Sequence, residues 1–406
     1  MRRGRRFHTP RDAGKVRRPS PVLEPTLPPT DTPEAPVPAE RLGWLALVGA
    51  LALFFLLGVP LQMVSTGVGI WFTEVFLFLG FGWALTRWSG RAPGPYLGLS
   101  WPGAGPLLVA LGVAVANYFA AVIPLQFLAQ LVAPRSWVEM FDQTQVFEHQ
   151  TGVELFLAMT GAVAAAPIGE EVIFRGLLLQ GLLRRGVRVL PAVVASAAIF
   201  SLCHVNIVGL PALFELGLVF GFLYARTRTV LPGMVAHLGS NLTATLLYAA
   251  GRGHDPAPVD LSAQVPAVLT ASIAGWVVLG LVLAAARRMP GAWGQPVNAE
   301  VLLPRVSLGR ALLPWTAAAS LCLLTWGLAD RRGLALDLAD ARVRVPAAAP
   351  ADPPSAREQR TELDALREDV HRGGASVERY LDARRALAAS LERRAVDAGA
   401  EGPAGH

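Results

Sequence analysis

The chain has 406 residues, of which 53% are hydrophobic and only 16% are charged. Soluble globular proteins carry about 25% charged residues, so this composition excludes an ordinary soluble enzyme or binding domain. The net charge is +6 and the pI is near 10. No pattern of alternating basic and aromatic residues accompanies this positive charge, so we expect no nucleic-acid partner.

The first part of the chain, residues 1–42, is basic and then rich in proline. Because it has too few apolar residues to bury a core, we expect a disordered arm. The arm is too long for the start of a cleavable signal peptide, and the apolar block that follows is long enough to span a membrane. Its arginines predict that the N-terminus is cytoplasmic and lies near anionic lipid.

Residues 43–330 are organised as apolar blocks, and a helix needs about 20 such residues to cross a bilayer core. One block could be a buried helix of a soluble protein, but nine together predict a polytopic all-α protein of the cell membrane, with a bundle of eight or nine transmembrane helices around a buried polar site. Nine crossings would place the C-terminal tail outside and eight would place it inside, and the sequence leaves both open. The blocks lie near 43–63, 67–88, 103–133, 151–186, 189–207, 211–226, 230–250, 265–286 and 311–329.

Two segments depart from the simple pattern of spans. The block 151–186 is long enough for nearly two crossings and contains Pro167 and Gly169, which predict a kink or a partial re-entry. The last segment, 331–406, begins with prolines and then shows apolar residues at helical spacing on either side of a Gly-Gly pair. We therefore expect a proline-rich linker and a soluble helical hairpin there.

Three polar clusters interrupt the apolar blocks between residues 150 and 250, where ionisable groups are costly and usually functional. Their order along the chain is Glu-Glu-x-x-x-Arg, then Phe-x-x-x-His, then His-x-x-x-Asn. The polar members are Glu170, Glu171, Arg175, His204, His237 and Asn241.

Helical spacing assigns different tasks to the two glutamates. Glu171 and Arg175 are four residues apart, so they share a helix face and can form an ion pair. Glu170 points about 100° away and is free for other work. Either histidine alone, or a lone asparagine between helices, would more often be a structural group.

The depth of the clusters indicates that they can meet. Glu170 lies 14 residues before Arg184, and His204 lies 16 residues after Arg188. His237 and Asn241 lie 9 and 13 residues after Arg228. All four residues are therefore roughly 14–24 Å from the predicted cytoplasmic ends of their helices. A glutamate in an apolar pocket can act as a general base, and histidine or asparagine can stabilise an oxyanion. Together these groups predict hydrolysis of a peptide bond.

The three motifs, taken as an ordered set, resemble those of the CPBP family of intramembrane proteases, which includes CAAX prenyl endopeptidases and bacteriocin-processing or immunity relatives. The resemblance covers about 150–250. It implies that Glu170 activates a water with help from His204, and that His237 and Asn241 stabilise the oxyanion. It also implies that Glu171 and Arg175 shape the site.

The resemblance leaves the cofactor and the substrate open. If a zinc ion is used, Glu170, His204 and His237 would be its ligands; otherwise the family chemistry needs no cofactor. The expected partners are the lipid bilayer and a peptide or protein substrate at the membrane, prenylated or not. The alternative is a non-catalytic binding or immunity protein that uses the same buried residues structurally. Oligomeric state is not readable from the sequence.

Overall fold

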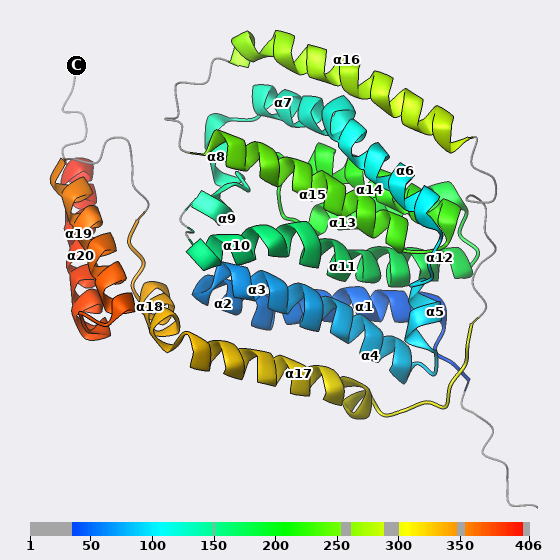
Figure 1. Cartoon of the computed structure of the whole chain (residues 1–406), viewed down its shortest axis with the longest axis horizontal. Helices are drawn as coiled ribbons and strands as arrows, with labels where there is room; N and C mark the ends of the chain where they lie inside the picture. The colour runs from blue at the N-terminus through cyan, green and yellow to red at the C-terminus, as the bar shows by residue number, and fades with distance from the viewer. Residues whose placement is uncertain are drawn as a thin grey trace, which may run out of the picture. The chain divides into compact units, whose positions relative to one another are not determined.

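A computed structural model describes residues 35–148, 150, 152–252, 261–287, 300–346 and 354–400 (Figure 1). Most of the predicted N-terminal arm, residues 1–34, lies outside this described part. The described residues form helices and no strand, apart from an isolated antiparallel bridge between Arg91 and Leu302. The all-α class predicted from the sequence is therefore confirmed.

Seven helical runs in the described part of the chain are long and apolar enough to cross a membrane. Several of them join α-helical segments through stretches of wider π-helical turns, labelled η. The runs are Ala39–Val64 (α1, η1, α2), Thr66–Trp88 (α3, η2, α4), Ala104–Val132 (α6, η3, α7), Gly152–Arg184 (α10, η4, α11, η5, α12), Leu210–Thr227 (α14), Ala263–Ala286 (within α16) and Leu308–Ala329 (α17).

The other two predicted blocks also form helices, but they fall outside these seven. Helix α13, Val189–Cys203, has only 15 residues and is too short to count as a span. Helix α15, Leu231–Gly251, has 21 residues but carries His237 and Asn241 among its apolar side chains, which lowers its hydropathy. Three of the six predicted site residues belong here, with His204 at the C-terminal cap of α13 and His237 and Asn241 in α15. The two helices that do not count as spans are therefore ones that carry candidate functional residues.

The long run Gly152–Arg184 is continuous, so the chain does not end one helix and start another at Pro167 and Gly169, where the sequence predicts a kink or partial re-entry. Pro167 stands near the start of α11, Ala166–Glu171, directly after the π-helical segment η4, Gly161–Ala165. The wider turns accommodate the missing N–H of the proline without ending the helix. Glu170 and Glu171 therefore lie in an unbroken helix.

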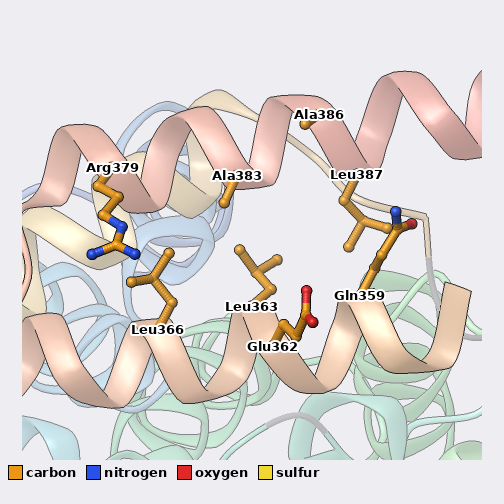
Figure 2. Close-up of a pocket in the computed structure, with 8 residues that line it drawn as sticks. All are labelled: Gln359, Glu362, Leu363, Leu366, Arg379, Ala383, Ala386 and Leu387. Atoms are coloured by element: carbon orange, nitrogen blue, oxygen red, sulfur yellow. The ribbon is translucent and has the colours of Figure 1, made fainter. Parts of the chain in front are cut away.

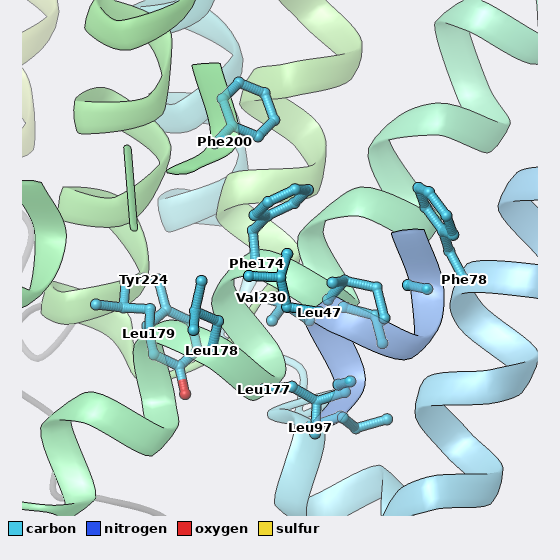
Figure 3. Packing of buried hydrophobic residues seen from close by; sticks show 14 of the residues in the cluster. Leu47, Phe78, Leu97, Phe174, Leu177, Leu178, Leu179, Phe200, Tyr224 and Val230 are labelled. Carbon is cyan, nitrogen blue, oxygen red and sulfur yellow. The ribbon is translucent and has the colours of Figure 1, made fainter. Parts of the chain in front are cut away.

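The core surrounds η5, Val172–Leu179, whose side chains are all buried (Figure 3). Helix α1, Ala39–Leu53, packs against η5 so closely that a Cβ on Gly43 would be 2.8 Å from the carbonyl oxygen of Leu177. A glycine is needed there because any side chain would force the two helices apart. On another side, α13 and α14 pack against each other, and the Ser196 hydroxyl of α13 donates to the Phe174 carbonyl.

Short helices connect the spans, and three longer ones form the tail. The tail has one helix more than the predicted hairpin, since α18 also forms, and the three share a small apolar core. A hollow of about 450 Å³ lies between α19 and α20 (Figure 2). None of the residues that line it belongs to the predicted site. The remaining helices are α5 (Pro93–Leu97), α8 (Arg135–Met140), α9 (Gln145–Glu148), α18 (Arg331–Arg342), α19 (Pro354–Arg372) and α20 (Val377–Ala400).

Ion pairs join the three tail helices. Arg367 of α19 contacts Asp337 at 2.6 Å and Asp340 at 3.3 Å, both on α18. Tyr380 of α20 donates a hydrogen bond to Asp340 at 2.7 Å. Burial raises the pKa of Asp337 from 3.8 to about 7; Arg367 opposes this rise, and Glu154 and the neighbouring aspartates add to it.

This shift predicts a tail that is less stable at higher pH. Between about pH 4 and 7 the folded tail holds a proton that the unfolded tail releases, so stability falls as the pH rises through this window, by at most about 1.4 kcal/mol per pH unit. Hydrogen exchange of α18 in the full-length protein, corrected for intrinsic rates, should show weaker protection at about pH 7.5 than at about pH 5. Asp337→Asn should remove most of that difference. Equal protection at both pH values in the unaltered protein would contradict the prediction.

Candidate active site

The predicted pair of Glu171 and Arg175 forms in the centre of the bundle. The Arg175 guanidinium donates to Glu171 Oε1 at 2.7 Å, and neither side chain is exposed. The second guanidinium nitrogen donates to the carbonyl oxygen of Gly217 in α14 at 3.2 Å. The guanidinium also lies over the rings of Phe200 and Phe220, 4.5 and 5.3 Å from their centroids. The pair thus ties three helices together through charge and aromatic contact.

His237 lies between the two glutamates. Its Nδ1 is 3.4 Å from Glu171 Oε1, and its Nε2 is 3.9 Å from Glu170 Oε2. The Phe220 ring stacks on the imidazole, with centroids 4.7 Å apart. Beside it, a Cβ on Gly233 would lie 2.6 Å from Glu171 Oε2, so a larger residue at this position would displace the carboxylate. The orientation of His237 is therefore set from both sides.

His204 reaches the same carboxylate from the end of α13. Its Nε2 is 4.0 Å from Glu170 Oε2. Its Nδ1 is 2.8 Å from the carbonyl oxygen of Phe200, one helical turn earlier, and the two rings meet edge to face. The Phe-x-x-x-His spacing thus has a physical basis, because the phenylalanine supplies both the carbonyl and the ring that hold the histidine. Phe174 and Phe200 lie next to each other in the core beneath it (Figure 3).

The two distances from Glu170 to the histidines define a gap. At 3.9 and 4.0 Å they exceed a direct hydrogen bond, which is about 3.2 Å at most, but one water could bridge either pair. Glu170 Oε2 is buried and has no hydrogen-bond partner among the described residues. An unsatisfied carboxylate oxygen facing two imidazoles is a suitable position for a reacting water.

The same distances test the fit of a zinc ion. Donor atoms around a tetrahedral zinc lie about 3.3–3.4 Å apart, since each bond is about 2.0–2.1 Å. Glu170 Oε2 is farther than this from both histidine nitrogens. Among the described residues, no three His, Cys, Asp or Glu side chains are spaced to hold a metal ion. As placed, Glu170, His204 and His237 do not fit a tetrahedral zinc.

Asn241 lies one helical turn beyond His237, and its amide nitrogen donates to the carbonyl oxygen of Ala162 at 2.8 Å. This contact joins α15 to η4, on the same helical run that carries Glu170. An asparagine amide has two N–H groups, so one remains for another acceptor. The described contacts of Asn241 include none with Glu170 or the histidines.

A further acidic residue, Glu74, lies next to the site and is not among the residues predicted from the sequence. Glu74 of η2, Thr73–Gly80, is buried, and its Oε2 lies so close to Gly169 that a Cβ on this glycine would overlap it. The carboxyl groups of Glu74 and Glu170 are close enough to interact electrostatically. An acidic residue in the middle of an apolar block was the only signal for it, and it has no motif partner in the sequence.

Comparison with known proteins supports this location of the site. Residues 152–243 match a family model described as type II CAAX prenyl endopeptidase Rce1-like, and this segment contains all six predicted site residues. The match confirms the resemblance to CPBP and CAAX proteases over residues 152–243, which make up less than half of the chain. Neither the curated proteins nor the solved structures contain a match to this chain.

The contribution of the buried Glu171–Arg175 pair to the free energy of unfolding can be tested by substitution. Arg175→Ala should lower the free energy of unfolding by about 3–5 kcal/mol, because it leaves Glu171 charged and unpaired in the interior. The double variant Glu171→Gln/Arg175→Met should be more stable than Arg175→Ala, since it buries no unpaired charge. The measurement is denaturant-induced loss of helicity in detergent. A single variant as stable as the unaltered protein would show that the pair contributes nothing to the fold.

Proposed function

We propose that this protein is an intramembrane endopeptidase that hydrolyses a peptide bond with a water activated by Glu170 and His204. The observation that supports this most directly is the unpartnered Oε2 of Glu170, placed 4.0 Å from His204 Nε2 and 3.9 Å from His237 Nε2. The family match over 152–243 supports protease activity in general. The roles of individual residues are our assignment from the geometry.

In the proposed first step, a water lies in the gap between Glu170 and His204 and transfers a proton to the carboxylate as its oxygen attacks the scissile carbonyl carbon. The carbonyl oxygen then becomes an oxyanion. His237 would donate to it from Nε2, which faces Glu170; because Nδ1 faces the Glu171 carboxylate, this requires the imidazolium form, in which both ring nitrogens are donors. The free N–H of Asn241 is the second proposed donor.

In the second step the tetrahedral intermediate collapses, the C–N bond breaks, and the proton held by Glu170 passes to the leaving nitrogen. The carboxylate is restored for the next cycle, so no electrons or further reactants are required. Glu171 stays paired with Arg175 throughout. Its proposed task is to orient His237 and to keep the position of the oxyanion donor constant.

We further propose that the N-terminus is cytoplasmic, as the flanking arginines indicate, and that the substrate reaches the site from the bilayer. The Rce1-like match favours a peptide with a prenylated cysteine near its C-terminus. Matched fluorogenic peptides, one farnesylated and one unmodified, added to the protein in lipid vesicles would distinguish prenyl recognition from general cleavage of membrane peptides. A proteomic comparison with Glu170→Ala would identify the natural substrate as the membrane protein that accumulates uncleaved.

The catalytic set should fail as a unit. Glu170→Gln, His204→Ala and His237→Ala should each lower kcat at least about 100-fold while the protein still folds, because each removes a group needed in the transition state. Glu362→Gln and His371→Ala, in the exposed part of the tail, are the matched controls and should keep full activity. Full turnover in purified Glu170→Gln would show that Glu170 is not the general base. Folded unaltered protein that cleaves no membrane peptide would instead favour a non-catalytic binding protein.

The proposed mechanism also predicts how the enzyme responds to loss of metal. The distances from Glu170 to the histidines support a water-bridged site, so activity should survive dialysis against a strong chelator, and active preparations should contain far less than one zinc per chain. Elemental analysis of the assayed sample is the measurement. About one zinc per chain, together with inactivation by the chelator and recovery on adding zinc, would require Glu170, His204 and His237 to close into a metal site.

A further inference from the structure

The turn that follows His204 has an unusual backbone. Helix α13 ends at Cys203, with His204 as its C-terminal cap, and the next residue, Val205, has a φ of +48°. Among the described residues only Val205 and Arg228 have positive φ without being glycine. The left-handed region is unfavourable for L-residues, and most of all for β-branched ones. Strain of this kind persists only where surrounding contacts impose it.

Asn206 supplies those contacts. Its side chain is buried, and its Oδ1 accepts a hydrogen bond from the backbone N–H of Gly209 at 2.7 Å. Its Nδ2 donates to the carbonyl oxygen of Phe141 at 3.2 Å. Phe141 ends helix α8, more than 60 residues away in sequence, so the turn is held both from within and from a distant segment.

Gly209 shows how closely the turn is packed. A Cβ at this position would lie 2.7 Å from Asn206 Nδ2. No side chain fits unless the amide moves away from Phe141. The turn from His204 to Gly209 therefore has one compact arrangement, and the Asn206 amide lies at its centre.

We infer that Asn206 is a positioning residue for His204: its two hydrogen bonds hold the turn, with Val205 in the left-handed conformation, and so keep His204 at the end of α13, where Phe200 orients its ring towards Glu170. The inference rests on the proposed function, in which His204 helps to activate the water. Asn206 itself need not touch the substrate. Its loss lets the chain after α13 relax to an ordinary backbone conformation, so that the end of α13 loosens and His204 is no longer held beside Glu170.

The first test uses Asn206→Ala in the full-length protein in lipid vesicles, with the farnesylated fluorogenic peptide as the probe. Misplacement of a catalytic group by about 1 Å costs up to about 100-fold, so kcat should fall about tenfold or more while KM changes less than about twofold. Hydrogen exchange of the 201–209 segment should rise, with exchange in α15 unchanged. This exchange measurement requires no substrate.

Rescue by glycine separates positioning from a direct chemical role. Glycine adopts positive φ without strain, so Val205→Gly should leave kcat near that of the unaltered protein. The double variant Val205→Gly/Asn206→Ala should recover a substantial part of the kcat that Asn206→Ala loses. Asn206→Asp keeps the acceptor for Gly209 N–H and loses the donor to Phe141, so its kcat should lie between those of the unaltered protein and Asn206→Ala.

The outcomes separate this inference from the proposed function. Full turnover in His204→Ala would overturn the role of His204 itself. Loss of turnover in His204→Ala with full turnover and unchanged exchange in Asn206→Ala would overturn the positioning role alone. A loss of turnover in Asn206→Ala that Val205→Gly does not relieve, with exchange of 201–209 unchanged, would also overturn it, because Asn206 would then act without holding the turn.

Discussion

The ion pair between Glu171 and Arg175 lies in a spanning helical run, is fully enclosed by protein, and is the interaction around which the site is assembled. A buried ion pair is costly unless other groups compensate its charges. Two of these groups come from separate helices, since Gly217 belongs to α14 and His237 to α15. Docking of these helices therefore stabilises the pair and places His237 against Glu171, so folding of the bundle and formation of the site are coupled.

Two adjacent glutamates have different roles because their surroundings differ. Glu171 is unexposed and has an arginine partner, whereas the side chain of Glu170 is 15% exposed and its Oε2 lacks a hydrogen-bond partner among the described residues. Environment assigns different roles to chemically identical carboxylates in other hydrolytic sites as well. The aromatic rings of Phe200 and Phe220 pack against the Arg175 guanidinium, and one or both of them also contact His204 and His237.

Much of this arrangement follows from local rules that a single sequence reveals. The i,i+4 spacing predicted the Glu171–Arg175 contact, and helical rise predicted that Glu170, His204 and His237 share one level. Contacts between distant segments could not be predicted that way. The hydrogen bond from Asn241 to Ala162 and the left-handed Val205 both depend on how separate segments dock. The unbroken helix through Pro167 depends on π-helical turns, which have no sequence signature.

The shortness of α13 has a consequence for the surrounding lipid. Its 15 residues rise about 22 Å, whereas a bilayer core is about 30 Å thick. If α13 begins at one surface of the bilayer, the chain leaves the helix at His204 within the thickness of an average membrane, where its last carbonyl groups need water or a thinner bilayer. Hydrophobic mismatch would then link turnover to acyl-chain length, because the thickness of the membrane would influence how easily water reaches the histidine.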